Sequence, residues 1–262
     1  NVSYVETTDF ARLPKNSPNQ GHGHHWYGNA ESYFLLGNAL GKSMVQLLKT
    51  EADADRKQKA RVLILGDSIS IGYTPTVQKL LANDAVVFRP MQSEKKPENC
   101  AGTDNGIANI DRWLKIDGGN WDVIHFNFGL HDLKHVSAQT GKNSNNATDP
   151  LQSNPEEYQQ QLTEILSKLK KTNARLILGT TTPVPPGAKP LREETSPPIY
   201  NEIAKKIARE NGIEINDLYA HALARLSEIQ RPANVHFSAE GSQVLGKKVA
   251  TAIAEALANR NQ

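Results

Sequence analysis

The chain has 262 residues, enough for one large domain or two small ones. Its 30 Lys and Arg residues against 28 Asp and Glu leave a net charge of +2, which is too balanced for a protein that binds nucleic acid without regard to sequence. The single cysteine excludes an intrachain disulfide and a thiolate-rich zinc site. No apolar run approaches the roughly 20 residues of a membrane span.

The first 60 residues differ from the rest and are expected to form an N-terminal extension that packs on a main domain of residues 61–262. The composition of residues 21–28 is typical of a loop, apolar residues three or four apart predict a helix over 31–49, and the polar stretch 50–60 predicts a connection.

Three histidines in the N-terminal loop, His22, His24 and His25, could hold a metal with a distant carboxylate, but their spacing in a glycine-rich loop fixes no coordination geometry. We therefore expect no metal at these histidines. The loop could instead contact substrate through His25, Trp26 and Tyr27, or the two aromatic rings could simply anchor the extension to the domain.

Apolar runs and helical patterns alternate from residue 61 onward. Strands are predicted over 62–65, 85–88, 121–128, 175–178 and 213–215, and helices over 76–81, 107–114, 155–171, 198–211 and 239–259. Alternation of this kind predicts an α/β fold with three layers, a flavodoxin-like parallel sheet covered by helices on both faces.

Right-handed crossovers place the C-terminal ends of parallel strands at one edge of the sheet, where ligands bind. Segments 66–73, 98–106 and 127–134 each follow a predicted strand, and residues 232–238 precede the last helix. We expect these four segments to form the functional site. Residues 136–155 are a long polar insert without periodicity.

Ser68 is a candidate nucleophile because it follows a buried strand and the turn at Gly66. Amide groups at the start of the next helix could stabilise a developing negative charge. The alternative is that Ser68 or Asp67 merely caps the helix. The segment is not the G-x-S-x-G elbow, because Ser70 stands at the second glycine. A serine nucleophile needs a base, and His236 in segment 232–238 could supply it; a loop histidine is otherwise a surface residue.

Three short motifs occur in order after these predicted elements. They are Gly66-Asp67-Ser68-Ile69-Ser70, Gly129-Leu130-His131-Asp132 and Val235-His236-Phe237. In their order and wide spacing they resemble the SGNH hydrolases, also called GDSL esterases and lipases. The resemblance covers about residues 61–258 and leaves the N-terminal extension unexplained.

The resemblance implies a serine esterase that needs no cofactor, with Ser68 as nucleophile and His236 as general base. It also implies that the oxyanion is held by the backbone N–H groups of Ser68 and Gly102, with Gly106 as the competing alignment for the second donor. Without the resemblance, Gly102 would be read as a turn glycine.

The chain departs from the pattern of this family at two positions. His131 stands where the family has the asparagine of Gly-x-Asn-Asp; its ring could still donate to the oxyanion, more strongly if protonated, or could bind substrate or be structural. Ala233 stands where the family has the triad aspartate. The base could then act in a Ser–His dyad, be oriented by the neutral Asn234, or receive an acid from elsewhere, whereas Asp132 is expected to be structural.

We expect the substrate to be a small-molecule or polysaccharide ester, with short acyl groups such as acetyl removed from carbohydrate. Lipid, thioester and sulfate esters stay open, and so does a catalytically degenerate glycan-binding protein. Because the chain opens at Asn1 without a methionine, a secreted or periplasmic location is expected. Flanking cations hint at an anionic substrate, namely Lys95, Lys96, Arg112 and Lys134.

Overall fold

The computed structural model describes residues 2–21 and 23–259. The chain divides into two units, Asn1–Gln58 and Lys59–Gln262.

The smaller unit consists of short turns followed by one long helix. The turns are η1 (Thr8–Phe10), η2 (Pro14–Asn16) and η3 (Gly23–Gly28), and the helix α1 spans Ala30–Gln58. The helix therefore continues through the stretch predicted as a connection, because Ala, Glu, Lys, Arg and Gln all favour helix even without an apolar face. Tyr33 on α1 holds the preceding turn by donating its hydroxyl to the His25 carbonyl at 2.9 Å.

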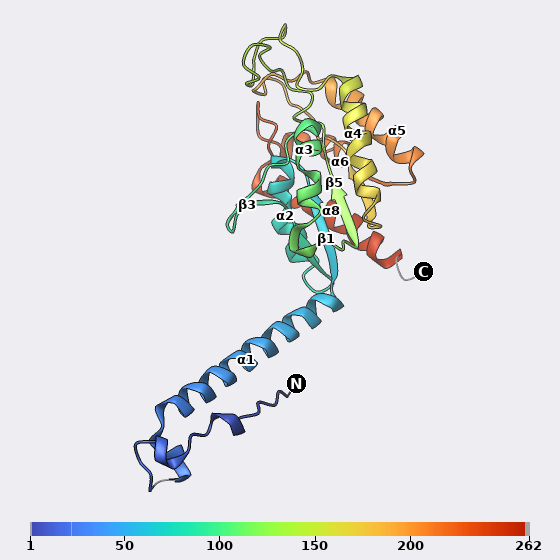
Figure 1. The fold of residues 1–262 in the computed structure, drawn as a ribbon. Helices are drawn as coiled ribbons and strands as arrows, with labels where there is room; N and C mark the ends of the chain where they lie inside the picture. Colours follow the sequence, from blue (N-terminus) through green and yellow to red (C-terminus); the bar gives the residue numbers. More distant parts are fainter. Residues whose placement is uncertain (1, 22, 260–262) are drawn as a thin grey trace. The chain divides into compact units, whose positions relative to one another are not determined.

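The larger unit contains a five-stranded parallel sheet in the order β2-β1-β5-β6-β7. Strands β1 and β5 of this sheet are labelled in Figure 1. The strands are β1 (Ala60–Leu65), β2 (Ala85–Phe88), β5 (Val123–Phe126), β6 (Arg175–Gly179) and β7 (Glu214–Asn216). Residues 62–65 of β1 have no exposed surface, as expected for a strand covered on both faces. This strand order is that of flavodoxin, so the predicted fold class is confirmed.

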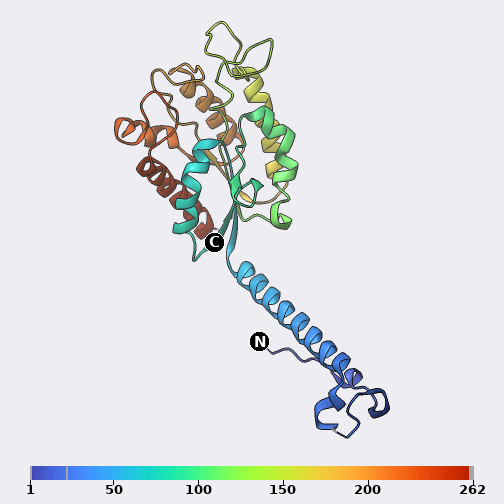
Figure 2. The same ribbon diagram turned by 90° about the vertical axis from the view of Figure 1, so that its left-hand side faces the viewer.

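Helices cover both faces of this sheet (Figure 2). One face carries α2 (Ser68–Leu80) and α8 (Ala239–Ala258), against which the short helices α6 (Leu218–Leu223) and α7 (Leu226–Ile229) pack. The other face carries α3 (Thr103–Trp113), α4 (Pro155–Lys170) and α5 (Ser196–Glu210). The remaining elements are the hairpin β3 (Met91–Ser93) and β4 (Lys96–Pro97) and the turn η4 (Ile116–Gly118).

Helix α2 begins eight residues before the start predicted from the sequence. Gly72 and Pro75 weaken the helical pattern, yet both lie inside α2. The helix tolerates them because it packs closely on α8: a Cβ at Gly246 of α8 would lie 2.6 Å from the Thr76 Cβ. Tertiary packing therefore outweighs local propensity here, and it makes Ser68 the first residue of a helix.

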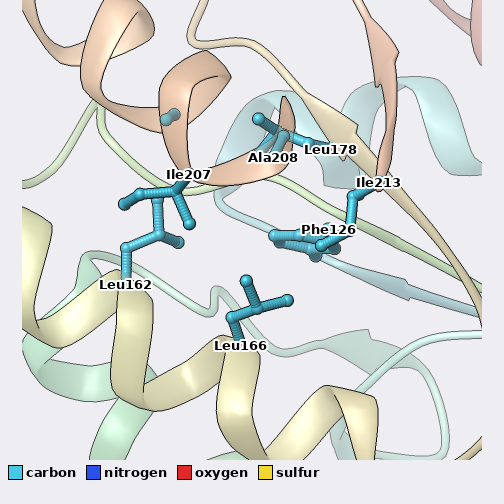
Figure 3. Close-up of a pocket in the computed structure, with 8 residues that line it drawn as sticks. Phe126, Leu162, Leu166, Leu178, Ile207, Ala208 and Ile213 are labelled. Carbon is cyan, nitrogen blue, oxygen red and sulfur yellow. The ribbon is translucent and has the colours of Figure 1, made fainter. Parts of the chain in front are cut away.

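A small cavity lies between α4, α5 and the sheet (Figure 3). Its walls are entirely apolar, formed by residues such as Phe126, Leu162 and Ile207. It contains no group that could do chemistry and is part of the hydrophobic core. Within the described residues, no helix combines the length and apolarity needed to cross a bilayer.

Candidate active site

Ser68 lies at the start of α2, directly after β1. The N-cap of this helix is Asp67, whose Oδ1 accepts a hydrogen bond of 2.9 Å from the Ile69 amide. The capping role therefore falls to Asp67, and the Ser68 hydroxyl is left for another partner. The Ser68 amide belongs to the first turn of the helix, where N–H groups lack an intrahelical acceptor.

His236 is brought to Ser68 from the other end of the polypeptide. Its Nε2 lies 2.9 Å from the Ser68 Oγ, although 168 positions separate the two residues. The loop that positions the ring runs from α7 to α8, and the Arg231 amide donates to the His236 carbonyl at 3.0 Å. The two groups are thus at hydrogen-bond distance, which is the geometry a serine needs to be activated by a base.

Asn234 determines which nitrogen of this ring has the proton. Its Oδ1 lies 2.9 Å from the His236 backbone amide and 2.7 Å from Nδ1 of the ring. Since a backbone N–H can only donate, the atom of Asn234 facing it must be the oxygen. Nδ1 therefore carries the hydrogen, and Nε2 is free to accept the Ser68 proton. Asn234 occupies the place of the triad acid with a neutral side chain.

We expect replacement of Asn234 with Ala to lower kcat for an ester substrate by roughly 10²-fold, the lower end of what a positioned general base contributes. The reason is that the ring would lose the acceptor that holds its tautomer and orientation. Asn234→Asp is the matched variant and should retain most of the activity, because a carboxylate oxygen can accept the same two hydrogen bonds. Equal kcat values for Asn234→Ala and the parent would show that something else orients the ring.

The environment lowers the pKa of His236 below its ordinary value of 6.5, chiefly through burial and further through the positive charges of Arg231 and Arg192. A lowered pKa keeps the imidazole neutral at pH 7, so it can accept a proton. The acid limb of kcat/KM should therefore lie below pH 6.5, with activity lost as the pH falls through the His236 pKa.

We expect Arg231→Gln to move this acid limb to higher pH, because removing a positive charge favours the imidazolium. The displacement should be less than about one pH unit, since exposed Arg231 acts through water. Profiles of kcat/KM against pH for the parent and Arg231→Gln measure it. A limb that stays in place or moves to lower pH would contradict this account of the His236 environment.

Gly102 approaches the same turn from the loop before α3. The Cys100 amide donates to the Gly66 carbonyl at 3.2 Å and so ties this loop to the turn before Ser68. Gly102 is the N-cap of α3, and a Cβ there would lie 2.9 Å from the Asp132 Oδ1. Gly106 is different: its amide donates to the Gly102 carbonyl at 3.0 Å, and a Cβ there would meet Ile165. Gly106 therefore has a packing role and no free amide, which favours Gly102 as the second oxyanion donor.

Asp132 is committed to the start of α3. Its Oδ1 accepts hydrogen bonds of 2.7 Å from the Thr103 amide and 2.5 Å from the Thr103 hydroxyl. Burial raises the pKa of Asp132 to about 6. These contacts fit the structural role expected from the sequence, in which Asp132 secures the segment that presents Gly102.

His131 precedes Asp132 and is half-buried. Burial, with the charges of Lys134, Arg192 and His236, lowers the pKa of His131 to about 3. The ring is therefore neutral near pH 7, the state in which one ring nitrogen donates and the other accepts. Lys134 Nζ lies 3.4 Å from Nδ1, and because an ammonium group only donates, Nδ1 is the acceptor and Nε2 carries the hydrogen. His131 thus presents one N–H donor.

A cleft of about 200 Å³ opens beside Ser68 and His236. Ile69, Ile71 and Phe237 contribute an apolar side, while Arg231 and Ser242 contribute polar groups. The cleft offers an apolar surface for an acyl group directly beside the serine hydroxyl.

The predicted substrate-binding residues belong to the smaller unit, whereas Ser68 belongs to the larger one; they are His25, Trp26 and Tyr27. Trp26 packs near Tyr33 of the same unit, with ring centroids 6.0 Å apart. Their contact with substrate stays a prediction. His22 and the side chain of His24 lie outside the described part of the chain, and within that part no three His, Cys, Asp or Glu side chains are grouped to hold a metal ion.

Arg192 lies close to His131 and Lys134 and was not predicted from the sequence. It lies on the loop after β6, is only 7% exposed, and forms an isolated antiparallel bridge with Lys134. Nothing in the local sequence indicates this position, because no periodic element contains it. Of the cations singled out from the sequence, Arg112 is neutralised by Glu98 at 2.7 Å, whereas Lys134 lies next to His131.

Solved structures with the same fold include several esterases. The acetyl xylan esterase AlAXEase is 18% identical over 74% of this chain and 99% of that protein, with a TM-score of 0.57. A lipase/acylhydrolase from Enterococcus faecalis is 17% identical over 74% of this chain and 95% of its own, with a TM-score of 0.59. A mutant of Axe2, an acetyl-xylooligosaccharide esterase from Geobacillus, is 16% identical over 74% and 94%, with a TM-score of 0.56.

No curated protein matches the chain significantly. The model of the GDSL-like lipase/acylhydrolase family matches residues 64–244, which include Ser68, Gly102, His131 and His236. The match covers well over half of the chain and includes all three motifs identified in the sequence. The chain belongs to the GDSL-like lipase/acylhydrolase family, whose members hydrolyse esters.

Proposed function

We propose that this protein is a serine esterase that removes short acyl groups, acetyl above all, from a carbohydrate. The observation that supports the catalytic part most directly is the Ser68–His236–Asn234 arrangement, with its distances of 2.9 and 2.7 Å. A glycan-binding protein without activity would have no need to hold a serine hydroxyl against the acceptor nitrogen of an oriented imidazole.

In the proposed reaction, Ser68 Oγ attacks the ester carbonyl while His236 Nε2 takes its proton. The resulting oxyanion accepts hydrogen bonds from the N–H groups of Ser68, Gly102 and His131. His236 then returns the proton to the departing alcohol, which leaves an acyl group on Ser68. Water attacks this acyl-enzyme with His236 again as base, and the acid product and free serine are released.

Substrate choice is proposed from the shape and chemistry of the cleft. Its apolar side beside Ser68 is short, formed by Ile69, Ile71 and Phe237, and suits a small acyl group. The polar groups around it, including Arg231 and Ser242, suit a hydroxyl-rich alcohol. Two of the esterases with the same fold act on acetylated xylan or xylo-oligosaccharides according to their descriptions, which supports the same substrate class here.

A panel of esters tests this proposal. Acetate release should be measured from acetylated xylan and xylo-oligosaccharides, next to p-nitrophenyl esters of increasing acyl length. We expect kcat/KM to be highest for acetyl and to fall as the acyl chain lengthens. A steady rise up to octanoyl would instead indicate a lipid or thioester substrate. Binding of these sugars without turnover by the parent protein would support the glycan-binding alternative.

A further inference from the structure

Two cations, Lys134 and Arg192, lie near each other beside the candidate active site, close enough to interact electrostatically. They are direct partners in an isolated antiparallel bridge, and the Leu191 carbonyl accepts from the His135 amide at 3.0 Å next to them. Side chains opposite each other across such a bridge lie on the same face, where like charges are destabilising. Holding these two positive charges together therefore lowers the stability of the folded chain.

The Arg192 guanidinium is only partly satisfied by the protein. Its Nε donates to the Leu130 carbonyl at 2.8 Å and its Nη1 to the Pro190 carbonyl at 3.0 Å. Its Nη2 has no hydrogen-bond partner in the described chain and is not sealed from solvent. The residue is 7% exposed, so one donor of an otherwise buried, fixed guanidinium is left for a ligand.

No carboxylate of the described residues lies within ion-pair distance of either cation. Among the residues that the structure describes, the one side-chain partner of Lys134 is neutral, the Nδ1 of His131 at 3.4 Å. Asp67 acts electrostatically on Arg192, and Asp104 and Asp132 act on Lys134, but these carboxylates accept their hydrogen bonds from Ile69, Gln152 and Thr103. Buried charges are normally paired directly, and these two cations have no directly paired counter-ion among the described residues.

The pair is adjacent to the reacting groups. Arg192 binds the carbonyl of Leu130, the residue before His131, and Lys134 contacts the His131 ring itself. The positive charge of Arg192 also acts on His236. A group bound between the two cations would therefore belong to a molecule whose ester lies at Ser68.

We propose that Lys134 and Arg192 form an anion subsite that receives a carboxylate, sulfate or phosphate of the substrate next to the ester bond cleaved at Ser68. This inference rests on the proposed esterase function and specifies the substrate as an acidic ester, such as an acylated acidic sugar. Arg192 supplies a fixed N–H donor and Lys134 a mobile point charge, which suit an oxyanion of any of these types.

A matched pair of esters tests the subsite, namely 4-acetoxybenzoate and its uncharged methyl ester. In Lys134→Gln the glutamine can still donate to His131 but has no charge. We expect the ratio of kcat/KM for 4-acetoxybenzoate to kcat/KM for the methyl ester to fall about 10-fold relative to the parent, as loss of one charged hydrogen bond predicts, because any effect of Lys134 through His131 falls on both esters and cancels in the ratio. Lys247→Gln, at an exposed position on α8, is the control and should not change this ratio.

Sulfate binding gives a second readout that needs no turnover. At constant ionic strength, sulfate should raise the unfolding temperature of Ser68→Ala, and this increase should be lost when Lys134→Gln is added. Equal losses of kcat/KM on the two esters would assign Lys134 to oxyanion stabilisation and overturn the anion subsite. Sulfate protection that persists without Lys134 would also overturn the subsite. If the parent hydrolyses neither ester but sulfate still protects through Lys134, the esterase proposal fails and the anion subsite stands.

Discussion

Replacing Ser68 with alanine should lower kcat for p-nitrophenyl acetate by about 10⁴- to 10⁶-fold, the range found when a serine nucleophile is removed. The reason is that the acyl-enzyme could no longer form, while His236 and the oxyanion donors would remain in place. The rate should be measured with the uncatalysed hydrolysis subtracted. A mass spectrum after treatment with a serine-directed fluorophosphonate should show one adduct on the parent and none on Ser68→Ala.

Ser70→Ala is the matched control for this variant. Ser70 lies in the same helix two residues on and is buried; its hydroxyl donates to the Asp67 carbonyl at 2.7 Å and accepts from Arg89 Nη1 at 3.3 Å, without contacting His236. The Ser70→Ala variant should lower stability by about 1–2 kcal/mol through the lost hydrogen bonds but leave kcat within a few-fold of the parent. Turnover unchanged in Ser68→Ala, or an adduct retained there, would remove Ser68 from the mechanism and with it the esterase proposal.

Replacing His131 with alanine should lower kcat by about 10²- to 10³-fold, the loss typical of one oxyanion donor. The reason is that Nδ1 of the neutral ring accepts from Lys134, so Nε2–H is the donor that the ring can offer to the oxyanion. His131→Asn should restore part of the activity, because an amide can donate from a similar position, and this rescue separates hydrogen-bond donation from packing. Circular dichroism and the unfolding temperature of both variants control for loss of the fold.

The pH dependence gives a further check on His131. Since the pKa of His131 is about 3, its protonation should add no limb to the kcat/KM profile between about pH 4 and 8. An acid limb in that range should come from His236 or from the buried Asp67 and Asp132, whose pKa values burial raises to about 6. The same limb should persist in His131→Asn. A kcat for His131→Ala within about twofold of the parent would eliminate the oxyanion role.

The linear pattern of the chain already determined the fold and the residues to test. Strand β2 and helices α4 and α8 lie within a residue or two of their predicted bounds, because a continuous apolar run or a repeat every three to four residues directly reflects burial on a sheet or helix face. The motifs around Ser68 and His131 could be found because they follow the strands β1 and β5, and the motif around His236 because it precedes α8. The short elements β3, β4, α6 and α7 were not predicted, since they are too short to show periodicity.

The tertiary structure decided what the local sequence left open. Only the packing of α2 on α8 makes Ser68 a helix start, and only the fold of the loop after α7 brings the His236 ring to it. The choice of Asn234 as ring acceptor, the neutral state of His131 and the pairing of Lys134 with Arg192 depend on distances between segments far apart in the chain. Hydrogen bonds and charge interactions act over a few ångströms of space. The local sequence of one segment therefore cannot predict which residues from distant segments will contact it.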